Sequence, residues 1–462
     1  MTAQHSFASL ALQPALIQTI AQLGWETMTP IQAQSLPPIL NGADVIAQAK
    51  TGSGKTAAFA LGLLQKIDPT VLRPQALVLC PTRELAAQVA TEIRRLARAI
   101  PNCKVISLAG GTPVQRQADS LAHGVHVVVG TPGRIIDHLD RQSLDCSAIT
   151  TLVLDEADRM IDMGFYEDMA HIVSMCPQQR QSLLFSATYP DSINKDATLF
   201  VQHPVHIQVE SQLNPTQVAH RFYEVEPSDR FEAVVRLLLH DQPSSALVFC
   251  NTKAQCDHLT YYLREVGFSA LVLHGDLDQR DRDEVLIQFA NQSCTVLVAT
   301  DVAARGLDIQ GLPMVLNMEL PRQAEVYTHR IGRTGRADQQ GQAISLYAQF
   351  DQTVLQQLQQ QGIHTQPQPL PILKTSHRQP QPAPMQTVVI IGGKRDKLRP
   401  GDILGALTGD AGLDKSQVGK IQVGPVVSHV ALQQQVASLA LDRLLRYGIK
   451  GRRFKAHKVR YN

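Results

Sequence analysis

The segment Ala49-Lys50-Thr51-Gly52-Ser53-Gly54-Lys55-Thr56 decides the fold of the first part of this chain. It follows a short apolar run at 45–47 and precedes a stretch with helical patterning. Glycines at 52 and 54 let successive backbone N–H groups turn toward a polyphosphate, and the lysine supplies a positive charge for the β and γ groups. The threonine hydroxyl suits Mg²⁺, and the helix that begins there directs its positive end at the same anion. The sequence therefore predicts a strand, a phosphate-binding loop and a helix, with nucleotide-binding candidates Thr51, Gly52, Ser53, Gly54, Lys55 and Thr56.

A second motif, Leu152-Val153-Leu154-Asp155-Glu156-Ala157-Asp158, lies about one hundred residues downstream. It places two carboxylates just past an apolar strand, where Asp155 can hold Mg²⁺ and Glu156 can orient and activate water. Taken alone, the first motif is also typical of a Gly-rich turn and the second of a capped strand end. Together and in this order they predict a nucleotide-hydrolysing site, with Lys55, Thr56, Asp155 and Glu156 as catalytic candidates and Thr56 and Asp155 as metal ligands.

Short apolar runs alternate with amphipathic stretches through most of the chain. Runs such as 77–79, 127–129, 152–154 and 183–185 are continuously apolar, which indicates a parallel sheet covered on both faces. A second set of such runs begins near residue 218. We therefore predict two tandem α/β domains, at 1–210 and 211–360.

The last hundred residues differ in composition from the tandem region. Proline interleaved with glutamine predicts an extended polar linker at 361–385. Beyond it, 386–462 shows the order β-α-β-β-α-β, which is typical of a split-βαβ module of RNA-recognition type. Many ferredoxin-like folds share this order, so the net charge of the module is needed to distinguish an RNA-binding module from the others.

That charge is strongly basic. The segment 386–462 carries 14 Lys and Arg against 5 Asp and Glu, a surplus of +9, whereas the whole chain carries only +2. The first 385 residues are therefore mildly acidic, at −7. A basic module attached to an acidic remainder predicts that a polyanion is held chiefly by the C-terminal module.

Composition also excludes several classes of protein. A length of 462 residues suggests about three domains, and 44% hydrophobic with 18% charged residues is typical of globular protein rather than disorder. We expect no secretory signal, because residues 1–12 have neither a basic nor an apolar region, and no membrane span, because the sequence has no apolar run of about 18 residues. The seven cysteines are scattered singly, so we expect a cytoplasmic protein with neither disulfides nor a zinc site.

Further motifs accompany the two described above, in a fixed order along the chain. They are Thr29-Pro30-Ile31-Gln32, Pro81-Thr82-Arg83-Glu84-Leu85, Thr131-Pro132-Gly133-Arg134, Ser186-Ala187-Thr188, Ala299-Thr300-Asp301 and His329-Arg330-Ile331-Gly332-Arg333-Thr334-Gly335-Arg336. The ensemble resembles the DEAD-box RNA helicases over residues 7–350. This resemblance implies two RecA-like domains that close on ATP while they grip one RNA strand.

The resemblance also assigns roles to individual residues. Gln32 would bind the adenine edge and Trp25 would stack, although a lone Trp is more often a core residue. Asp301 would lie near the ribose and phosphates. Arg333 and Arg336 would contact the γ-phosphate, although this spacing is otherwise typical of a solvated basic face. Eight residues resemble the RNA-backbone contacts of the family: Thr82, Arg83, Gly111, Thr131, Arg134, Thr252, Thr300 and Arg305.

The C-terminal module resembles that of the DbpA-like subgroup, in the segments 391–403 and 451–455. The resemblance implies binding to a hairpin of large-subunit ribosomal RNA and a role in ribosome assembly. The segment 427–431 lacks the stacking aromatics of an ordinary RNA-recognition sheet. We therefore expect the RNA to be recognised by basic residues, although any one of them alone is also typical of a solvated surface. These residues are Lys394, Arg395, Lys397, Arg399, Arg452, Arg453 and Lys455.

These observations predict an α/β protein with two tandem RecA-like domains and a C-terminal RRM-like α+β domain. The predicted function is an ATP- and Mg²⁺-dependent RNA helicase that separates short duplexes near a ribosomal RNA site in pre-ribosomal particles. An RNA clamp, whose output is occupancy rather than unwinding, is the alternative. A processive DNA translocase is disfavoured by Gln32 and by the basic C-terminal module.

Overall fold

The structure, a computed structural model, describes residues 6–49, 52–186, 199–209, 218–304, 311–335, 341–370, 378–409 and 411–459. The chain divides into two compact units, Met1–Gln212 and Leu213–Asn462. The second unit contains the second α/β domain and the C-terminal domain. Among the described helices, none is both long and apolar enough to cross a lipid bilayer.

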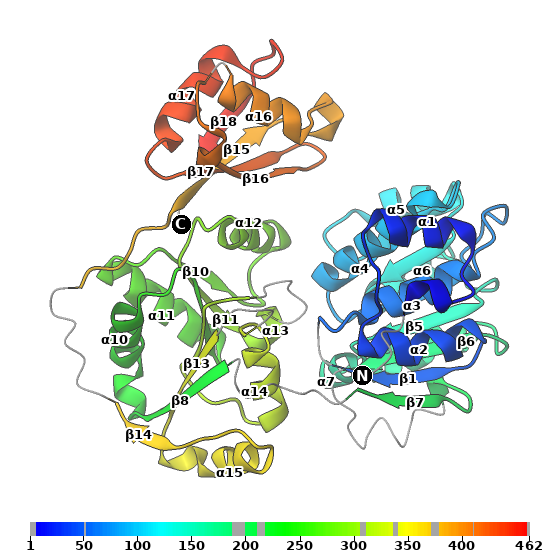
Figure 1. The fold of residues 1–462 in the computed structure, drawn as a ribbon, viewed down its shortest axis with the longest axis horizontal. Coiled ribbons are helices and arrows are strands. Elements are labelled where there is room, and N and C mark those ends of the chain that lie inside the picture. The colour runs from blue at the N-terminus through cyan, green and yellow to red at the C-terminus, as the bar shows by residue number, and fades with distance from the viewer. Residues whose placement is uncertain are drawn as a thin grey trace. The chain divides into compact units, whose positions relative to one another are not determined.

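The first unit is built on a seven-stranded parallel sheet with the order β3-β4-β2-β5-β6-β1-β7 (Figure 1). Alternate residues of a strand pack into the hydrophobic cores on opposite faces of the sheet: Val45 and Ala47 of β1 pack on one face, and Ile46 packs on the other. Burial of both faces explains the continuously apolar runs in the sequence and confirms the predicted parallel sheet. The strands are β1 Val45–Gln48, β2 Ala76–Leu79, β3 Val105–Leu108, β4 Val127–Gly130, β5 Thr151–Asp155, β6 Gln181–Ser186 and β7 Val205–Gln208.

Two groups of helices cover this sheet. Helices from the first part of the unit pack on one face, and those from the later part pack on the other. The first group comprises α1 Pro14–Gln22, α2 Pro30–Leu40, α3 Lys55–Gln65 and α4 Arg83–Leu96, with short helices Phe7–Ser9 and Ala97–Ala99. The later group comprises α5 Val114–Ala122, α6 Pro132–Asp140, α7 Ala157–Asp162 and α8 Tyr166–Ser174.

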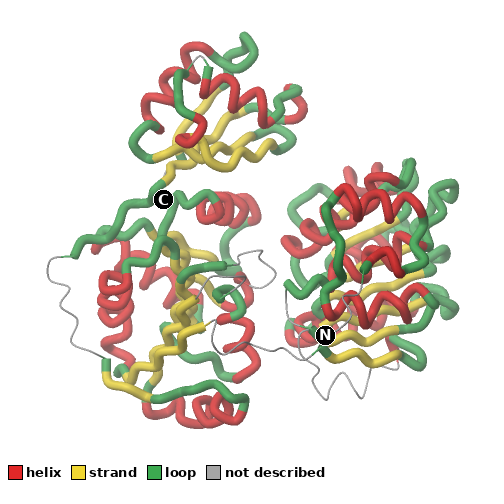
Figure 2. The backbone as a smooth tube through the Cα atoms, viewed as in Figure 1, coloured by secondary structure: helices red, strands yellow, loops and turns green. Residues whose placement is uncertain are grey.

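The second unit begins with another seven-stranded parallel sheet, of order β10-β11-β9-β12-β13-β8-β14. Figure 2 shows helices (red) on both sides of its strands (yellow). Its strands are β8 Val218–Glu224, β9 Ala246–Cys250, β10 Ala270–Leu273, β11 Val296–Thr300, β12 Met314–Asn317, β13 Gly341–Tyr347 and β14 Pro367–Pro369. Its helices are α10 Arg230–Asp241, α11 Lys253–Val266, α12 Gln279–Ala290, α13 Asp301–Ala304, α14 Ala324–Ile331 and α15 Gln352–Gln360, with short helices Pro227–Asp229 and Gln349–Asp351.

The C-terminal domain is a four-stranded antiparallel sheet with the order β16-β17-β15-β18. Val388, Ile390, Val430 and Leu432 face a core shared with the two helices, because alternate residues of a strand point to the same face of the sheet. The strands are β15 Met385–Ile391, β16 Val418–Val423, β17 Ser428–Gln433 and β18 Lys455–Lys458. The helices are α16 Pro400–Thr408 and α17 Ala437–Tyr447, with short helices Lys394–Asp396 and Lys415–Gln417. This order confirms the predicted β-α-β-β-α-β module.

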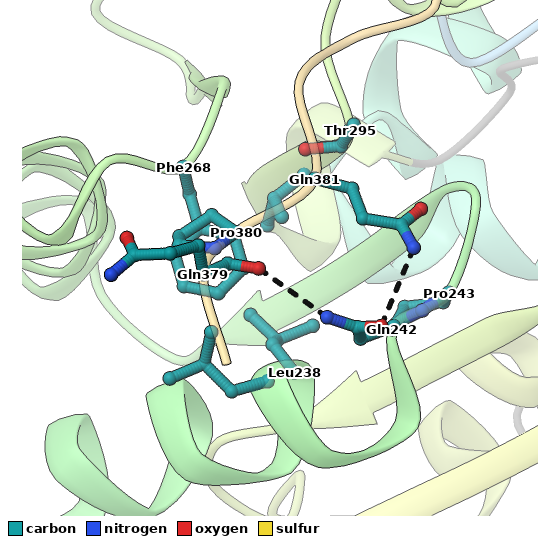
Figure 3. Close-up of a pocket in the computed structure, with 10 residues that line it drawn as sticks. Leu238, Gln242, Pro243, Phe268, Thr295, Gln379, Pro380 and Gln381 are labelled. Carbon is teal, nitrogen blue, oxygen red and sulfur yellow. Dashed lines mark hydrogen bonds between the residues drawn. The ribbon is translucent and has the colours of Figure 1, made fainter. Parts of the chain in front are cut away.

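The described parts of the predicted linker contact the domain before it. Strand β14 extends the second sheet at its edge, where proline is tolerated. Figure 3 shows Pro380 beside Phe268 in a small pocket, with Gln242 Nε2 donating to the carbonyl of Gln379 at 3.3 Å. Farther along, the buried Thr387 hydroxyl lies 2.7 Å from Ser293 Oγ, in the loop after α12. The Pro/Gln-rich segment therefore makes ordered contacts with the second domain in addition to its extended stretches.

Candidate functional site

The phosphate-binding loop joins β1 to α3. Gly54 is the N-cap of α3 in the left-handed conformation, at φ 97°. A Cβ at this position would lie 2.5 Å from Gln32 Nε2, so a side chain would collide as well as strain the backbone. The loop therefore requires glycine here for two independent reasons. Lys50 and Thr51 lie outside the described residues.

Two donors of this loop fit a polyphosphate. The side chain of Lys55 is buried, and neither its Nζ nor the Ser53 hydroxyl makes a hydrogen bond with a described protein atom. Burial lowers the pKa of Lys55, while Asp155 and Glu156 act in the opposite direction. Buried donors of this kind are costly unless a ligand satisfies them. The half-buried Thr56 follows directly, at the start of the same helix.

The carboxylates of the second motif lie at the end of β5. Burial raises the pKa of Asp155 to about 7, and the nearby Lys55 opposes that shift. Glu156 is the N-cap of α7, with a left-handed φ of 55° that is rare outside glycine. Because β5 and β1 both point their carboxyl ends toward this edge of the parallel sheet, the two motifs meet as predicted. Oxygen donors at Thr56 and Asp155 suit a hard cation such as Mg²⁺.

Arg159 belongs to the same cluster, although the motifs quoted from the sequence do not include it. Its Nη1 donates to Glu156 Oε2 at 2.5 Å, and both side chains are buried. The sequence signal was a basic residue three positions after Glu156 on a short helix, a spacing that brings side chains together.

The two adenine candidates differ in their surroundings. Gln32 Oε1 accepts from the backbone N–H of Thr29 at 2.9 Å, and its Nε2 donates to the carbonyl of Gly54 at 3.2 Å. Gln32 thus connects α2 to the phosphate-binding loop. The half-buried Trp25 packs against the first core, with its ring centroid 6.1 Å from that of Phe7. The Arg95 guanidinium lies 5.6 Å from the same ring.

Candidate RNA contacts of the first unit gather at one edge of its sheet. Thr82 is the N-cap of α4 and accepts from Leu85 N at 3.3 Å, and Thr131 is the N-cap of α6. Gly111 lies in the loop after β3 at φ 85°. Since β3, β4 and β2 are neighbours in the parallel sheet, their carboxyl ends bring these three residues to one edge.

Two arginines accompany them. Arg83 is exposed, and a Cβ on Gly110 would lie 2.3 Å from its Cζ, so this glycine makes room for the guanidinium. Arg134 Nη1 donates to Thr112 O at 2.8 Å and to Gln117 Oε1 at 2.7 Å. The buried Gln117 was not predicted as a site residue, and nothing in its local sequence distinguishes it from a surface glutamine.

Candidates of the second unit lie at the ends of adjacent strands. Thr252 follows β9 and caps α11, and Thr300 ends β11 beside Asp301 at the start of α13. Asp301 pairs with Arg330, a buried residue of α14 to which the sequence motif that contains it assigned no role. The side chain of Arg333 is buried just after that helix. Arg305 and Arg336 lie outside the described residues.

Basic candidates of the C-terminal domain lie in two adjoining loops, except Lys455, which is the first residue of β18. Arg452 Nη1 donates to Asp396 O at 3.0 Å, which joins the loop before β18 to the loop after β15. Lys394 N donates to Gly424 O at 2.8 Å, which holds the second of these loops against the β16–β17 turn. All seven basic candidates named from the sequence are exposed. The half-buried His429 has a pKa lowered by burial and lies on strand β17 opposite Val389, without an aromatic platform.

Comparison with known proteins agrees with this geometry. Residues 29–196 match the DEAD/DEAH box helicase family, 229–338 match the helicase conserved C-terminal domain, and 387–458 match the DbpA RNA binding domain. The chain is 49% identical over 451 residues to the ATP-dependent RNA helicase DbpA of Escherichia coli (strain K12), covering 97% of this chain and 98% of that protein. It is 44% identical over 340 residues to the DEAD-box ATP-dependent RNA helicase CshA of Bacillus cereus, covering 73% of this chain and 65% of the relative.

A solved structure has a similar fold over much of the chain. S. cerevisiae Dbp5 bound to RNA and ADP BeF3 is similar with a TM-score of 0.72 at 29% identity, covering 79% of this chain and 96% of that one. The phosphate-binding loop, the paired carboxylates and the C-terminal module all lie within the regions that match the family models. The chain therefore belongs to the DEAD-box ATP-dependent RNA helicases, in the DbpA-like subgroup.

Proposed function

We propose that this helicase hydrolyses ATP with Mg²⁺ to separate short RNA duplexes near a hairpin of large-subunit ribosomal RNA, in the cytoplasm, during ribosome assembly. The observation that carries the ATPase part is the buried cluster of Lys55, Asp155 and Glu156 at the carboxyl edge of the first sheet, where the loop after β1 and the end of β5 meet. The basic loops of a domain that matches the DbpA RNA binding domain support the choice of a structured RNA.

Each residue of the cluster has a proposed task. Ser53 and Lys55 bind the β- and γ-phosphates, and Gln32 holds the adenine while it remains linked to the loop. Thr56 and Asp155 hold Mg²⁺, which would offset phosphate charge and favour the ionised form of Asp155. Glu156 accepts a proton from water, whose oxygen bonds to the γ-phosphorus as the bond to the leaving ADP oxygen breaks.

Other residues are proposed to respond to RNA. Arg333, and Arg336 beyond the described residues, would stabilise charge on the γ-phosphate. Thr82, Arg83, Gly111, Thr131 and Arg134 gather at one sheet edge, where hydroxyls, backbone N–H groups and guanidinium groups suit sugar and phosphate. Thr252, Thr300 and Arg305 are proposed to make equivalent contacts from the second domain.

Glu156→Gln tests the proposal. The amide keeps the shape of the side chain but cannot accept the proton, so RNA-stimulated phosphate release should fall on the order of 10²–10⁴-fold while ATP and RNA still bind. Glu167→Gln, in the first turn of α8, is the matched control. Turnover by Glu156→Gln near the wild-type rate would contradict the assignment.

A strand-displacement assay separates unwinding from clamping. The wild-type chain should release a short strand from a duplex only when ATP is present. An RNA clamp would instead hold RNA in an ATP-dependent manner and leave the duplex intact. The buried pair of Glu156 with Arg159 favours turnover, because a clamp has no need of a positioned base.

A further inference from the structure

Five charged side chains are buried together around the phosphate-binding loop: Lys55, Asp155, Glu156, Asp158 and Arg159. Charged residues are seldom fully buried unless they are paired, so each member of such a cluster calls for an explanation. Lys55, Asp155 and Glu156 have proposed tasks toward ATP and Mg²⁺. Arg159 has none, although its side chain is only 2% exposed.

Arg159 contacts the residue that we propose as the base. Its Nη1 lies 2.5 Å from Glu156 Oε2, and the Glu156 side chain is 6% exposed. The backbone N–H of Arg159 donates to Asp158 Oδ1 at 3.0 Å, which holds the start of the helix beneath the pair. The left-handed φ of Glu156 further limits where its carboxylate can lie.

We propose that Arg159 is a positioning residue for ATP hydrolysis: it holds one carboxylate oxygen of Glu156 so that the other accepts the proton of the attacking water. This inference rests on the proposed role of Glu156. A charge-assisted hydrogen bond fixes both distance and orientation, and the buried setting strengthens it relative to an exposed pair. Without it, the carboxylate would rotate among positions that do not face the water.

Arg159 also affects the charge of the cluster. With all five groups ionised, the cluster of three carboxylates and two cations carries one net negative charge. Removal of Arg159 would leave two negative charges in a site that must accept a polyanion. The effects of charge and of orientation can therefore be separated. Arg159→Lys restores the positive charge, but it restores the orientation of the Glu156 carboxylate less fully.

The test compares Arg159→Gln, Arg159→Lys and the control Arg236→Gln in the full chain. Arg236 pairs with Glu232 on α10 at a comparable helical spacing, but that pair is exposed. Arg159→Gln should lower kcat for RNA-stimulated ATP hydrolysis on the order of 10- to 10²-fold, as a misplaced catalytic group does, while loss of the cation should raise KM for ATP by a smaller factor. Arg159→Lys should recover part of kcat, and Arg236→Gln should match wild type. A kcat for Arg159→Gln within about twofold of wild type would overturn the inference, as would a rise in KM at constant kcat.

A double-mutant cycle covers the case in which Arg159→Gln only loosens the fold. If Arg159 acts through Glu156, adding Arg159→Gln to Glu156→Gln should cost little further single-turnover rate. Equal losses in both backgrounds would assign Arg159 a merely structural role. Loss of turnover in Glu156→Gln but not in Arg159→Gln would reject this inference and keep the proposed function. Turnover by Glu156→Gln at the wild-type rate would reject the proposed function itself.

Discussion

Arg330 forms a two-pronged ion pair with Asp301, with Nε–Oδ1 at 2.6 Å and Nη2–Oδ2 at 2.8 Å. The same guanidinium donates to Asn251 Oδ1 at 2.8 Å and to Glu319 O at 2.7 Å. It also lies 5.0 Å from the centroid of the Phe249 ring. One buried side chain from α14 thus connects the ends of β9 and β11 and the segment after β12, where Asp301 is proposed to meet the nucleotide.

Arg330→Met should therefore destabilise the second domain. The substitution keeps a long apolar stem but leaves Asp301, Asn251 and a carbonyl without their donor, and breaking such a buried pair costs on the order of 3 kcal/mol. Urea unfolding of the full chain measures the change, and Arg330→Lys should cost less because one cation remains. Arg236→Met, in an exposed pair, is the control. Unfolding of Arg330→Met at the wild-type urea concentration would show that the network contributes nothing to stability.

Arg333→Ala should act on hydrolysis rather than on stability alone. A residue that stabilises charge on the γ-phosphate contributes a factor on the order of 10³ or more, so the RNA-stimulated rate should fall by that much while ATP still binds to the first domain. Single-turnover phosphate release at saturating ATP and RNA measures the effect. A loss confined to KM would exclude the proposed role.

His126 predicts a particular pH dependence of stability. Its ring is buried, its Nδ1 accepts from Lys104 N at 3.0 Å, and burial lowers its pKa. Between its folded pKa and an unfolded value of about 6.5, the unfolded chain binds more protons, so stability rises with pH in this window and is lost on acidification. Whereas the raised pKa of Asp155 makes its own contribution to stability grow on acidification, the contribution of His126 to the free energy of unfolding should fall between about pH 7 and pH 5. His138, His220 and His429 also have lowered pKa values and act in the same direction.

His126→Asn separates this group from the others, because an amide oxygen can accept the same hydrogen bond without titrating. The variant should lose less stability than wild type over the same pH range, measured as the difference in urea midpoints. An unchanged pH dependence would mean that His126 is not part of the acid response.

The sequence predicted most of the strands, though not β7 or β14, together with the order of elements in the C-terminal domain, because periodicity and motif spacing determine these locally. Arg159 was not predicted as a site residue, because its burial and its pairing with Glu156 depend on how α7 packs against the rest of the domain. Arg134 was predicted from the sequence as an RNA contact, but its hydrogen bonds to Thr112 and Gln117 were not predicted. Such contacts depend on residues distant in sequence, which no local pattern records.

The predicted linker shows the same limit. Composition identifies extended chain, but it cannot distinguish a free segment from one that packs on a neighbour. Pro380 lies beside Phe268, and Arg378 donates to the carbonyl of His240, so both contacts require the folded second domain. Arg378 is consequently a poor choice as an inert control in RNA-binding experiments.

The basic loops of the C-terminal domain are proposed to recognise a structured RNA. Point substitutions test this proposal better than truncation does. Removal of residues 386–462 would also remove Thr387, whose hydroxyl contacts Ser293 and Asn291 in the second domain. Arg399→Glu and Arg453→Glu instead alter exposed side chains at the two loops. Lys415→Glu is the control, because Lys415 precedes β16 at the opposite end of the strand from the β16–β17 turn that holds Lys394.

Charge reversal at Arg399 or Arg453 should weaken binding to a structured ribosomal RNA fragment and flatten its salt dependence. Each phosphate contact contributes roughly −0.7 to −0.9 to the slope of log K against log salt, so loss of one contact should change the slope by about that amount. The same variants should lose their preference for this fragment over unstructured RNA as an activator of ATP hydrolysis, while hydrolysis on saturating unstructured RNA stays near wild type. Since Lys415→Glu makes the same change of charge in the same domain, its unchanged preference would exclude a general electrostatic cause. If all three variants kept the wild-type preference and slope, the basic loops would not be the specificity surface, and the proposed ribosomal RNA target would lose its structural support.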